Sequence, residues 1–295
     1  MDGGLTVTLI SVAMFVGCFA LGFPPLLFRL SEKSLLLVSI LGAGLLCGTA
    51  LAITIPEGVG LLEESWRASS TSDVPSSLNA SEKTRNGSAT QKGPAPQFLI
   101  GVSLTSGFTF MFVVDQIGSY LSTRDRTTRL PNTIGITATL GLVIHAAADG
   151  FAVGAAVATG QVTVQVIVFL AVILHKAPAA FGLVSFLMHA GLEKKYIQGH
   201  LLAFSAAAPL LAITTYFILF ASGRSAQNQL TATGVGMLFS AGTFLYVATV
   251  HVLPEVSKTG QARGQQQHHL GLLESLTLIL GVGLPMVLAL GLHTN

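Results

Sequence analysis

Eight long apolar runs constrain this chain more than any other feature of its sequence. Each has about 20 or more residues, the length that a helix needs to cross a bilayer. Hydrophobic residues make up 51% of the 295 residues and charged residues only 9%, far below the roughly 25% of a soluble domain. The sequence therefore predicts an all-α polytopic membrane protein in contact with the lipid bilayer. The expected spans are about 5–28, 35–62, 98–118, 133–159, 163–189, 201–221, 230–256 and 270–291.

Short connections join most of these spans, so residues 1–295 are expected to form a single transmembrane domain. The exception is the segment 63–97, which is rich in Ser, Thr, Asn, Pro and Gly and is typical of a disordered loop. It contains glycosylation sequons at Asn79 and Asn86, and their use would place the loop outside the cytosol. With eight spans, both termini would then be extracytoplasmic too.

The basic residues give an independent indication of the same topology. The loops that it places inside carry nine Lys and Arg residues, and those outside carry five, four of them in the long loop. This distribution agrees with the positive-inside rule. The net charge of +2 is scattered over loops, so no nucleic-acid partner is expected. Cys18 and Cys47 form no CxxC motif and are expected to be small apolar residues within spans.

An internal similarity links the second span with the seventh. Residues 43–57 (AGLLCGTALAITIPE) match residues 241–255 (AGTFLYVATVHVLPE) in the placing of Ala-Gly and of a closing Pro-Glu. The two spans would cross the membrane in opposite directions. We therefore expect an inverted repeat that relates spans 1–3 to spans 6–8, a common plan among secondary transporters.

Ionisable groups inside the fourth and fifth spans are the candidate functional residues, because such groups are costly at membrane depth. His145 and Asp149 are four residues apart and therefore lie on one face of a helix. In the fifth span His175 is followed by Lys176, and Pro178 frees the carbonyl four residues before it. A very short turn near 160–162 should pack the two helices antiparallel and bring His175 opposite the other pair.

Two imidazoles and one carboxylate with an open coordination position suit zinc, and next iron(II), manganese or another first-row divalent ion. Calcium and magnesium prefer more oxygen ligands. For each residue alone, a buried His bonded to a carbonyl or an Asp paired with a base is the simpler interpretation. Their combination within two helices favours a metal site.

The chain resembles the ZIP (Zrt/Irt-like) zinc transporter family over essentially its whole length. The resemblance is carried by HAAADG at 145–150, HKAPAAFGLVSFLMHAGLE at 175–193 and SAGTFLYVATVHVLPEV at 240–256. It implies eight spans, a homodimer, no permanently bound cofactor, and movement of Zn²⁺ as substrate into the cytosol by an elevator-like shift. The protein would reside in the plasma membrane or in the Golgi and other endomembranes.

The resemblance also implies a primary metal site of His145, Asp149 and His175. At the positions where it implies ligands of a second metal, the chain has Ala146, Lys176 and Ala179, so we expect one ion per site. Our hypothesis is that Lys176 replaces the second cation, pairs with Asp149 in the absence of zinc and opposes zinc retention. The alternative is that Lys176 snorkels to an interface.

Several other polar residues are weaker candidates. His251 and Glu255 repeat the four-residue spacing in the seventh span, and Glu57 occupies the matching repeat position, so these three are expected on the ion pathway. Lesser candidates are Asp115, His189 and the loop pair His268 and His269, while Asp2 and His293 receive no role.

Two other functions compete with transport. The first is a membrane receptor for an apolar, steroid-like ligand, coupled to unknown signalling partners, which the same protein could combine with transport. The second is an intramembrane enzyme in which zinc activates water. The sequence lacks the HExxH metalloprotease pattern and a separate nucleophile constellation, so no enzymatic activity is expected.

Overall fold

The computed structural model describes residues 3–27, 31–72, 96–124, 132–189, 192–223, 225–252 and 271–293, and within these ranges all regular structure is helical. The elements are α1 (Gly3–Gly22), α2 (Pro24–Leu27), α3 (Glu32–Thr49), η1 (Ala50–Thr54), α4 (Ile55–Ser72), α5 (Pro96–Arg124), α6 (Asn132–Ala158), α7 (Val162–His189), α8 (Lys194–Ala221), α9 (Ala226–Tyr246), η2 (Val247–Val252) and α11 (Leu272–His293).

Seven of the eight expected spans correspond to described helices that are long and apolar enough to cross a membrane. The eighth corresponds to α11, whose apolar part, Leu272–Val287, is shorter. The chain is thus a multi-pass membrane protein, and the count of eight spans stays a prediction. The two sequons at Asn79 and Asn86 lie outside the described residues.

Several helix boundaries differ from the sequence-based expectation: α5 continues beyond residue 118 to Arg124, and α8 begins at Lys194 rather than near residue 201. The first span is divided, because α1 ends at Gly22 and the short α2 begins at Pro24, where proline cannot donate a backbone hydrogen bond to a preceding turn.

The second span does not end at residue 62. Helix α4 continues to Ser72, so the disordered loop predicted for 63–97 is wrong in its first turns. Glu63 and Arg67 form an i,i+4 ion pair of 3.6 Å, and the Gln227 side chain donates to the Ser65 carbonyl oxygen at 3.1 Å. These polar contacts extend the helix without an apolar period.

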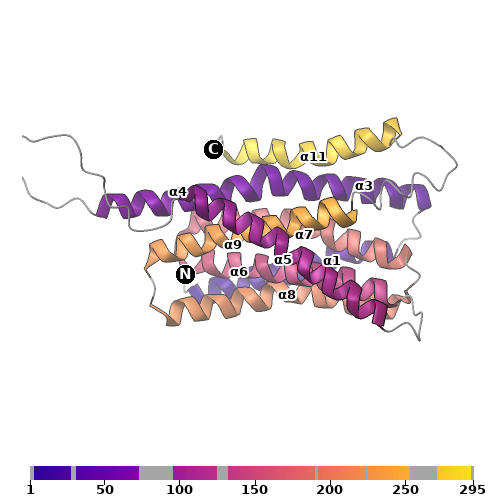
Figure 1. Ribbon diagram of the computed structural model, residues 1–295, viewed down its shortest axis with the longest axis horizontal. Coiled ribbons are helices and arrows are strands. Elements are labelled where there is room, and N and C mark those ends of the chain that lie inside the picture. Colours follow the sequence, from indigo (N-terminus) through magenta and orange to yellow (C-terminus); the bar gives the residue numbers. More distant parts are fainter. Residues whose placement is uncertain are drawn as a thin grey trace, which may run out of the picture.

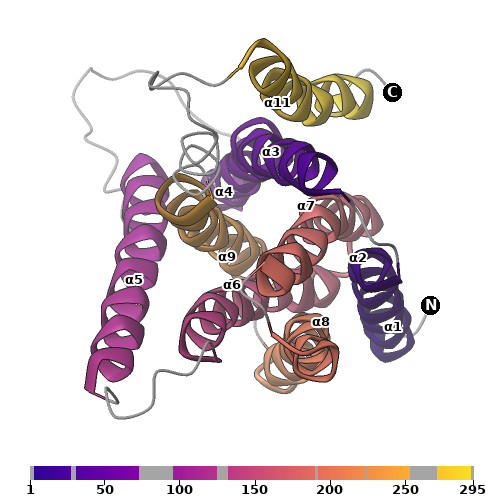
Figure 2. The same ribbon diagram turned by 90° about the vertical axis from the view of Figure 1, so that its right-hand side faces the viewer.

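The long helices run roughly parallel to one axis of the molecule, and both chain ends lie at the end of the bundle where α4 ends (Figure 1). Seen along that axis, α6 and α9 lie centrally, with α5 outside α9 and α11 outside α3 (Figure 2). Apolar side chains of α1, α6, α7 and α8 form most of the buried core. This packing places α6, α7 and α9 around a common centre.

Glycines allow two outer helices to approach closely. A Cβ atom on Gly44 of α3 would lie 2.9 Å from the Gly281 Cα atom of α11. A Cβ atom on Gly242 of α9 would lie 2.9 Å from the Phe108 amide nitrogen of α5 and closer still to the Leu104 carbonyl oxygen. Backbone therefore packs against backbone in both pairs, α3 with α11 and α9 with α5.

The long second and seventh spans each contain a π-helical segment. The segment η1 follows α3, and η2 follows α9. Within η1 the Thr54 hydroxyl donates to the Thr49 carbonyl oxygen, five residues back, at 3.3 Å. Such π segments are uncommon and often occur at functional sites.

Candidate metal site

A tight turn sets the geometry of α6 and α7. Helix α6 ends at Ala158, and Gly160 adopts a left-handed conformation with φ of 71°, which costs glycine little because it has no Cβ atom. Helix α7 begins at Val162. The connection is therefore as short as the sequence predicts, and the two helices pack side by side. Helix α7 continues through Pro178 to His189, so the proline does not end it.

The three predicted ligands come together in the interior. His175 Nε2 lies 3.0 Å from Asp149 Oδ2, and His145 Nε2 lies 3.4 Å from the same oxygen. One ligand atom from each residue falls within 4.8 Å of the others, and all three side chains are buried. His145 Nε2 has no hydrogen-bond partner among the described residues. The arrangement is a compact N₂O donor set that suits a transition-metal ion.

Helix α9 supplies two hydroxyl groups that sequence reasoning missed. Thr243 Oγ1 lies 2.9 Å from His145 Nδ1, and the Ser240 hydroxyl donates a short hydrogen bond to Asp149 Oδ1. Ser240 and Thr243 are fully buried and three residues apart, so they lie on one face of α9. Buried polar residues at i,i+3 in an apolar span were the available signal, but the sequence does not tell which helix they face.

Phe244 covers the imidazoles. Its ring centroid lies 4.6 Å from that of His145 and 4.9 Å from that of His175. The two imidazole centroids are themselves 5.5 Å apart. Apolar packing of this kind excludes water, so charges at the site interact more strongly than they would in solvent.

Lys176 is completely buried, with no exposed surface. Its Nζ atom lies 4.7 Å above the centroid of the Phe204 ring and has no hydrogen-bond partner within the described part of the chain. The ion pair expected between Lys176 and Asp149 does not form, because Asp149 is contacted by the two histidines and Ser240 while the ammonium faces the ring. Nor does Lys176 snorkel to an interface. A cation–π contact replaces both expected arrangements.

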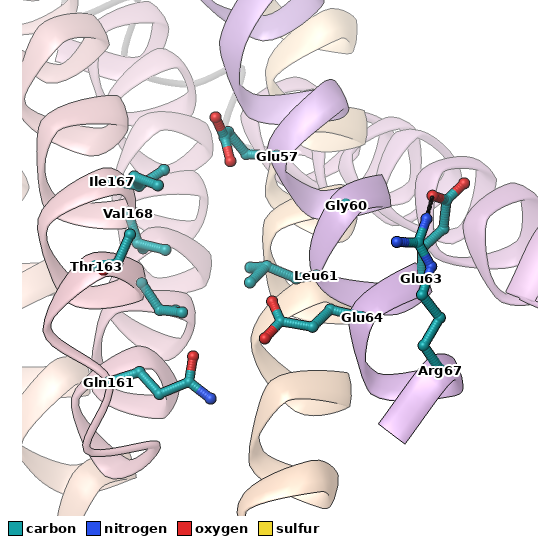
Figure 3. Close-up of a pocket in the computed structure, with 11 residues that line it drawn as sticks. Glu57, Gly60, Leu61, Glu63, Glu64, Arg67, Gln161, Thr163, Ile167 and Val168 are labelled. Carbon is teal, nitrogen blue, oxygen red and sulfur yellow. Dashed lines mark ion pairs between the residues drawn. The ribbon is translucent and has the colours of Figure 1, made fainter. Parts of the chain in front are cut away.

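Glu57 lines a cavity of about 610 Å³ between α4 and the beginning of α7. Figure 3 shows the Glu57 and Glu64 carboxylates on the α4 side of this space, with Gln161 and Thr163 across from them. Glu63 and Arg67 also line the cavity and pair with each other. The cavity lies toward the α4 end of the bundle and does not include the histidine and aspartate cluster.

The remaining sequence candidates are not brought to the cluster by the described structure. Asp115 accepts a hydrogen bond from the Tyr246 hydroxyl at 2.9 Å, on the outer side of α9. The side chains of His189 and His251 fall outside the described residues, as do Glu255, His268, His269, Asp2 and the side chain of His293.

Membrane-length helices around a buried histidine and carboxylate cluster define the class: a helical multi-pass membrane protein with a donor set for a metal ion. A family model described as ZIP zinc transporter matches residues 125–289, and the chain belongs to that family. The predicted family resemblance is thereby confirmed.

Some relatives match nearly the whole chain and others match part of it. Zinc transporter ZIP9 of Micropogonias undulatus is 50% identical over 309 residues, which cover 99% of this chain and 100% of that protein. Zinc transporter ZIP9-B of Xenopus laevis is 50% identical over 305 residues, covering 99% of each chain. Human zinc transporter ZIP4 is 34% identical over 145 residues, covering 48% of this chain and 21% of its own length.

Proposed function

We propose that this protein carries Zn²⁺ into the cytosol, from the extracellular space or an organelle lumen, through one site formed by His145, Asp149 and His175. The single observation that carries the proposal is the convergence of their ligand atoms within 4.8 Å, all buried inside membrane-length helices. Such groups are costly in a bilayer, so those that a chain keeps there usually serve a function. Zinc is the cargo named for the full-length relatives.

The site holds one ion. Ala146, Lys176 and Ala179 occupy the places where the family resemblance implies ligands for a second metal. With Asp149 at −1 and Lys176 at +1, the side chains sum to zero, and zinc brings the site to +2. The buried ammonium replaces the second cation and opposes zinc retention. The contact of the ammonium group with the Phe204 ring supports this role, because it holds the positive charge close to the site although Lys176 forms no ion pair with Asp149.

The cavity beside α4 is the proposed entrance. Glu57 lies across the cavity from Ile167, and Val168, which also lines the cavity, precedes His175 by two turns of α7. A carboxylate there attracts a divalent cation and passes it inward. His251 and Glu255 are the proposed ligands of the opposite half of the pathway.

Matched features of the two halves support the inverted repeat of spans 1–3 and 6–8. The alignment of 43–57 with 241–255 superimposes η1 on η2 within a few residues. It also equates Gly44 with Gly242, and each of these glycines contacts an outer helix, α11 and α5 respectively.

The proposed topology has both termini and the 63–97 segment outside the cytosol. Both chain ends lie at the end of the bundle where α4 ends, and this arrangement supports the proposed topology (Figure 1). On this topology Asn79 and Asn86 are available for glycosylation. We further propose that the protein works as a homodimer in the plasma membrane or the Golgi.

Isotopic zinc uptake tests the function. Wild type is compared with His145→Ala, Asp149→Ala and His175→Ala at matched surface expression, and in proteoliposomes. We expect uptake to fall to background in all three variants. Full activity in all three would overturn the site, and zinc-dependent turnover of a substrate without uptake would instead indicate an enzyme. Ligand-triggered signalling that survives His145→Ala would indicate a separate receptor role.

A further inference from the structure

We propose that Thr243 and Ser240 are positioning residues of the zinc site: they determine which atoms of His145 and Asp149 face the ion. The inference rests on the proposed function and deepens it. Both residues belong to α9, whereas the ligands that they contact belong to α6. Each hydroxyl group has a single proton, and the acceptor of that proton decides what the oxygen atom can do toward the ligands.

The Thr243 hydroxyl is a donor to its own helix. Its Oγ1 atom lies 2.7 Å from the Ser240 carbonyl oxygen, which has no proton and must accept. The same Oγ1 atom lies 2.9 Å from His145 Nδ1. Because its one proton is already committed to the carbonyl, Thr243 accepts at the histidine. His145 Nδ1 therefore carries the proton and donates to Thr243.

This assignment fixes the tautomer of His145. A neutral imidazole has one protonated nitrogen, so Nε2 has a free lone pair. That atom is the one that faces Asp149 Oδ2, 3.4 Å away, without a hydrogen bond. The opposite tautomer would set the Nδ1 lone pair against the Thr243 oxygen. It would also place the Nε2 proton where zinc must bind.

Ser240 acts on Asp149 in the same way. Its hydroxyl proton goes to Asp149 Oδ1, because a carboxylate only accepts. Ser240 Oγ is then also an acceptor toward His145 Nδ1, at 3.5 Å. Oδ1 is thereby engaged from α9, and Oδ2 is left to face both histidines. Removal of a hydrogen bond to a group that binds a metal typically lowers metal affinity by about 10- to 100-fold.

Three variants on one helix separate positioning from general stability. Thr243→Val keeps the shape of the side chain and removes the hydroxyl, while Thr243→Ser keeps the hydroxyl. Thr233→Val is the matched control, because Thr233 is equally buried in α9 and its hydroxyl donates only to the Gln229 carbonyl oxygen, at 2.8 Å. Zinc dissociation constants and uptake are measured on full-length protein in lipid. Nitrogen-15 NMR of labelled histidine reads the tautomer, with the His145 signal identified by its loss in His145→Asn.

We expect Thr243→Val to weaken zinc binding by about 10- to 100-fold and to shift zinc-free His145 toward the Nε2-protonated form. Thr243→Ser should restore both properties, and Thr233→Val should alter neither. Wild-type affinity and tautomer in Thr243→Val would overturn the proposal, as would an equal loss in Thr233→Val. If His145→Ala also binds and transports zinc normally, the proposed function itself fails. If only His145→Ala loses zinc, the positioning role alone fails.

Discussion

The contact between α5 and α9 offers a test of how packing behind the site controls its chemistry. Gly242 lies between Ser240 and Thr243 in sequence, and it faces α5. In Gly242→Ala the new Cβ atom would lie 2.9 Å from the Phe108 amide nitrogen and nearer to the Leu104 carbonyl oxygen, whereas real Cβ contacts essentially never fall below 3.0 Å. Both obstacles are helix backbone, so neither can rotate away.

The helices must therefore separate by on the order of 1 Å, and overpacking of this kind costs about 1–3 kcal/mol in the free energy of unfolding. Because α5 lies outside α9, movement of α9 away from α5 presses Thr243 toward α6 and distorts its 2.9 Å contact with His145. A hydrogen bond displaced by that amount from its preferred distance and angle loses most of its value. We expect Gly242→Ala to unfold at lower temperature and to bind zinc at least about tenfold more weakly.

Thermal unfolding in detergent and zinc binding in lipid measure the two effects. Gly101→Ala on α5 is the control, because a Cβ atom there would meet nothing within 4 Å. Alanine favours a helix over glycine, so this control should be neutral or more stable by up to about 1 kcal/mol. Wild-type stability and zinc affinity in Gly242→Ala would refute the close backbone contact and its link to the site.

Three further outcomes follow from the site and its entrance. Lys176→Met removes a buried charge that lacks a hydrogen-bond partner among the described residues, so we expect a more stable protein. The variant should bind zinc about tenfold or more tightly and release it more slowly from preloaded proteoliposomes. Unchanged release would contradict the proposed repulsion between Lys176 and zinc. Glu57→Gln should raise the KM of uptake with little change in maximal rate, whereas Glu274→Gln, which removes the same charge from the first turn of α11 outside the cavity lining, should not. Uptake should weaken as pH falls from about 8 to about 5, because zinc binds neutral imidazoles, and a flat profile would count against histidine ligands.

Local rules were sufficient to predict that His145, Asp149 and His175 come together in one cluster that could hold a metal ion. The four-residue spacing of His145 and Asp149 fixes a shared helix face, and the short turn at Gly160 fixes an antiparallel partner. Together these constraints place His175 opposite the pair without knowledge of any other helix. The spans were predictable for a similar reason, since the length of an apolar run is a local property of the sequence.

The features that sequence reasoning missed depend on contacts between distant segments. Ser240 and Thr243 lie more than ninety residues from His145 and Asp149, and only the packing of α9 against α6 brings them together. The Lys176 ion pair was wrong for a related reason. Lys176 follows His175 directly in the sequence, which suggested that its ammonium group would reach Asp149. The Lys176 side chain instead faces the ring of Phe204, a residue of α8 that the local sequence does not place.

The proposed repeat explains why the two histidines are held differently. In such a repeat α3 corresponds to α9 and α7 corresponds to α6. The contact of α9 with α6 therefore corresponds to the contact of α3 with α7, and both contacts are present. The alignment equates Ser240 with Gly42 and Thr243 with Leu45, so the α3 side offers no hydroxyl at these positions. Accordingly His145 Nδ1 is bound by α9, while His175 Nδ1 has no hydrogen-bond partner in the described part of the chain. His145 is thus held through Nδ1 by α9, whereas His175 is held through Nε2 by Asp149, so the two imidazoles present different nitrogen atoms to their neighbours.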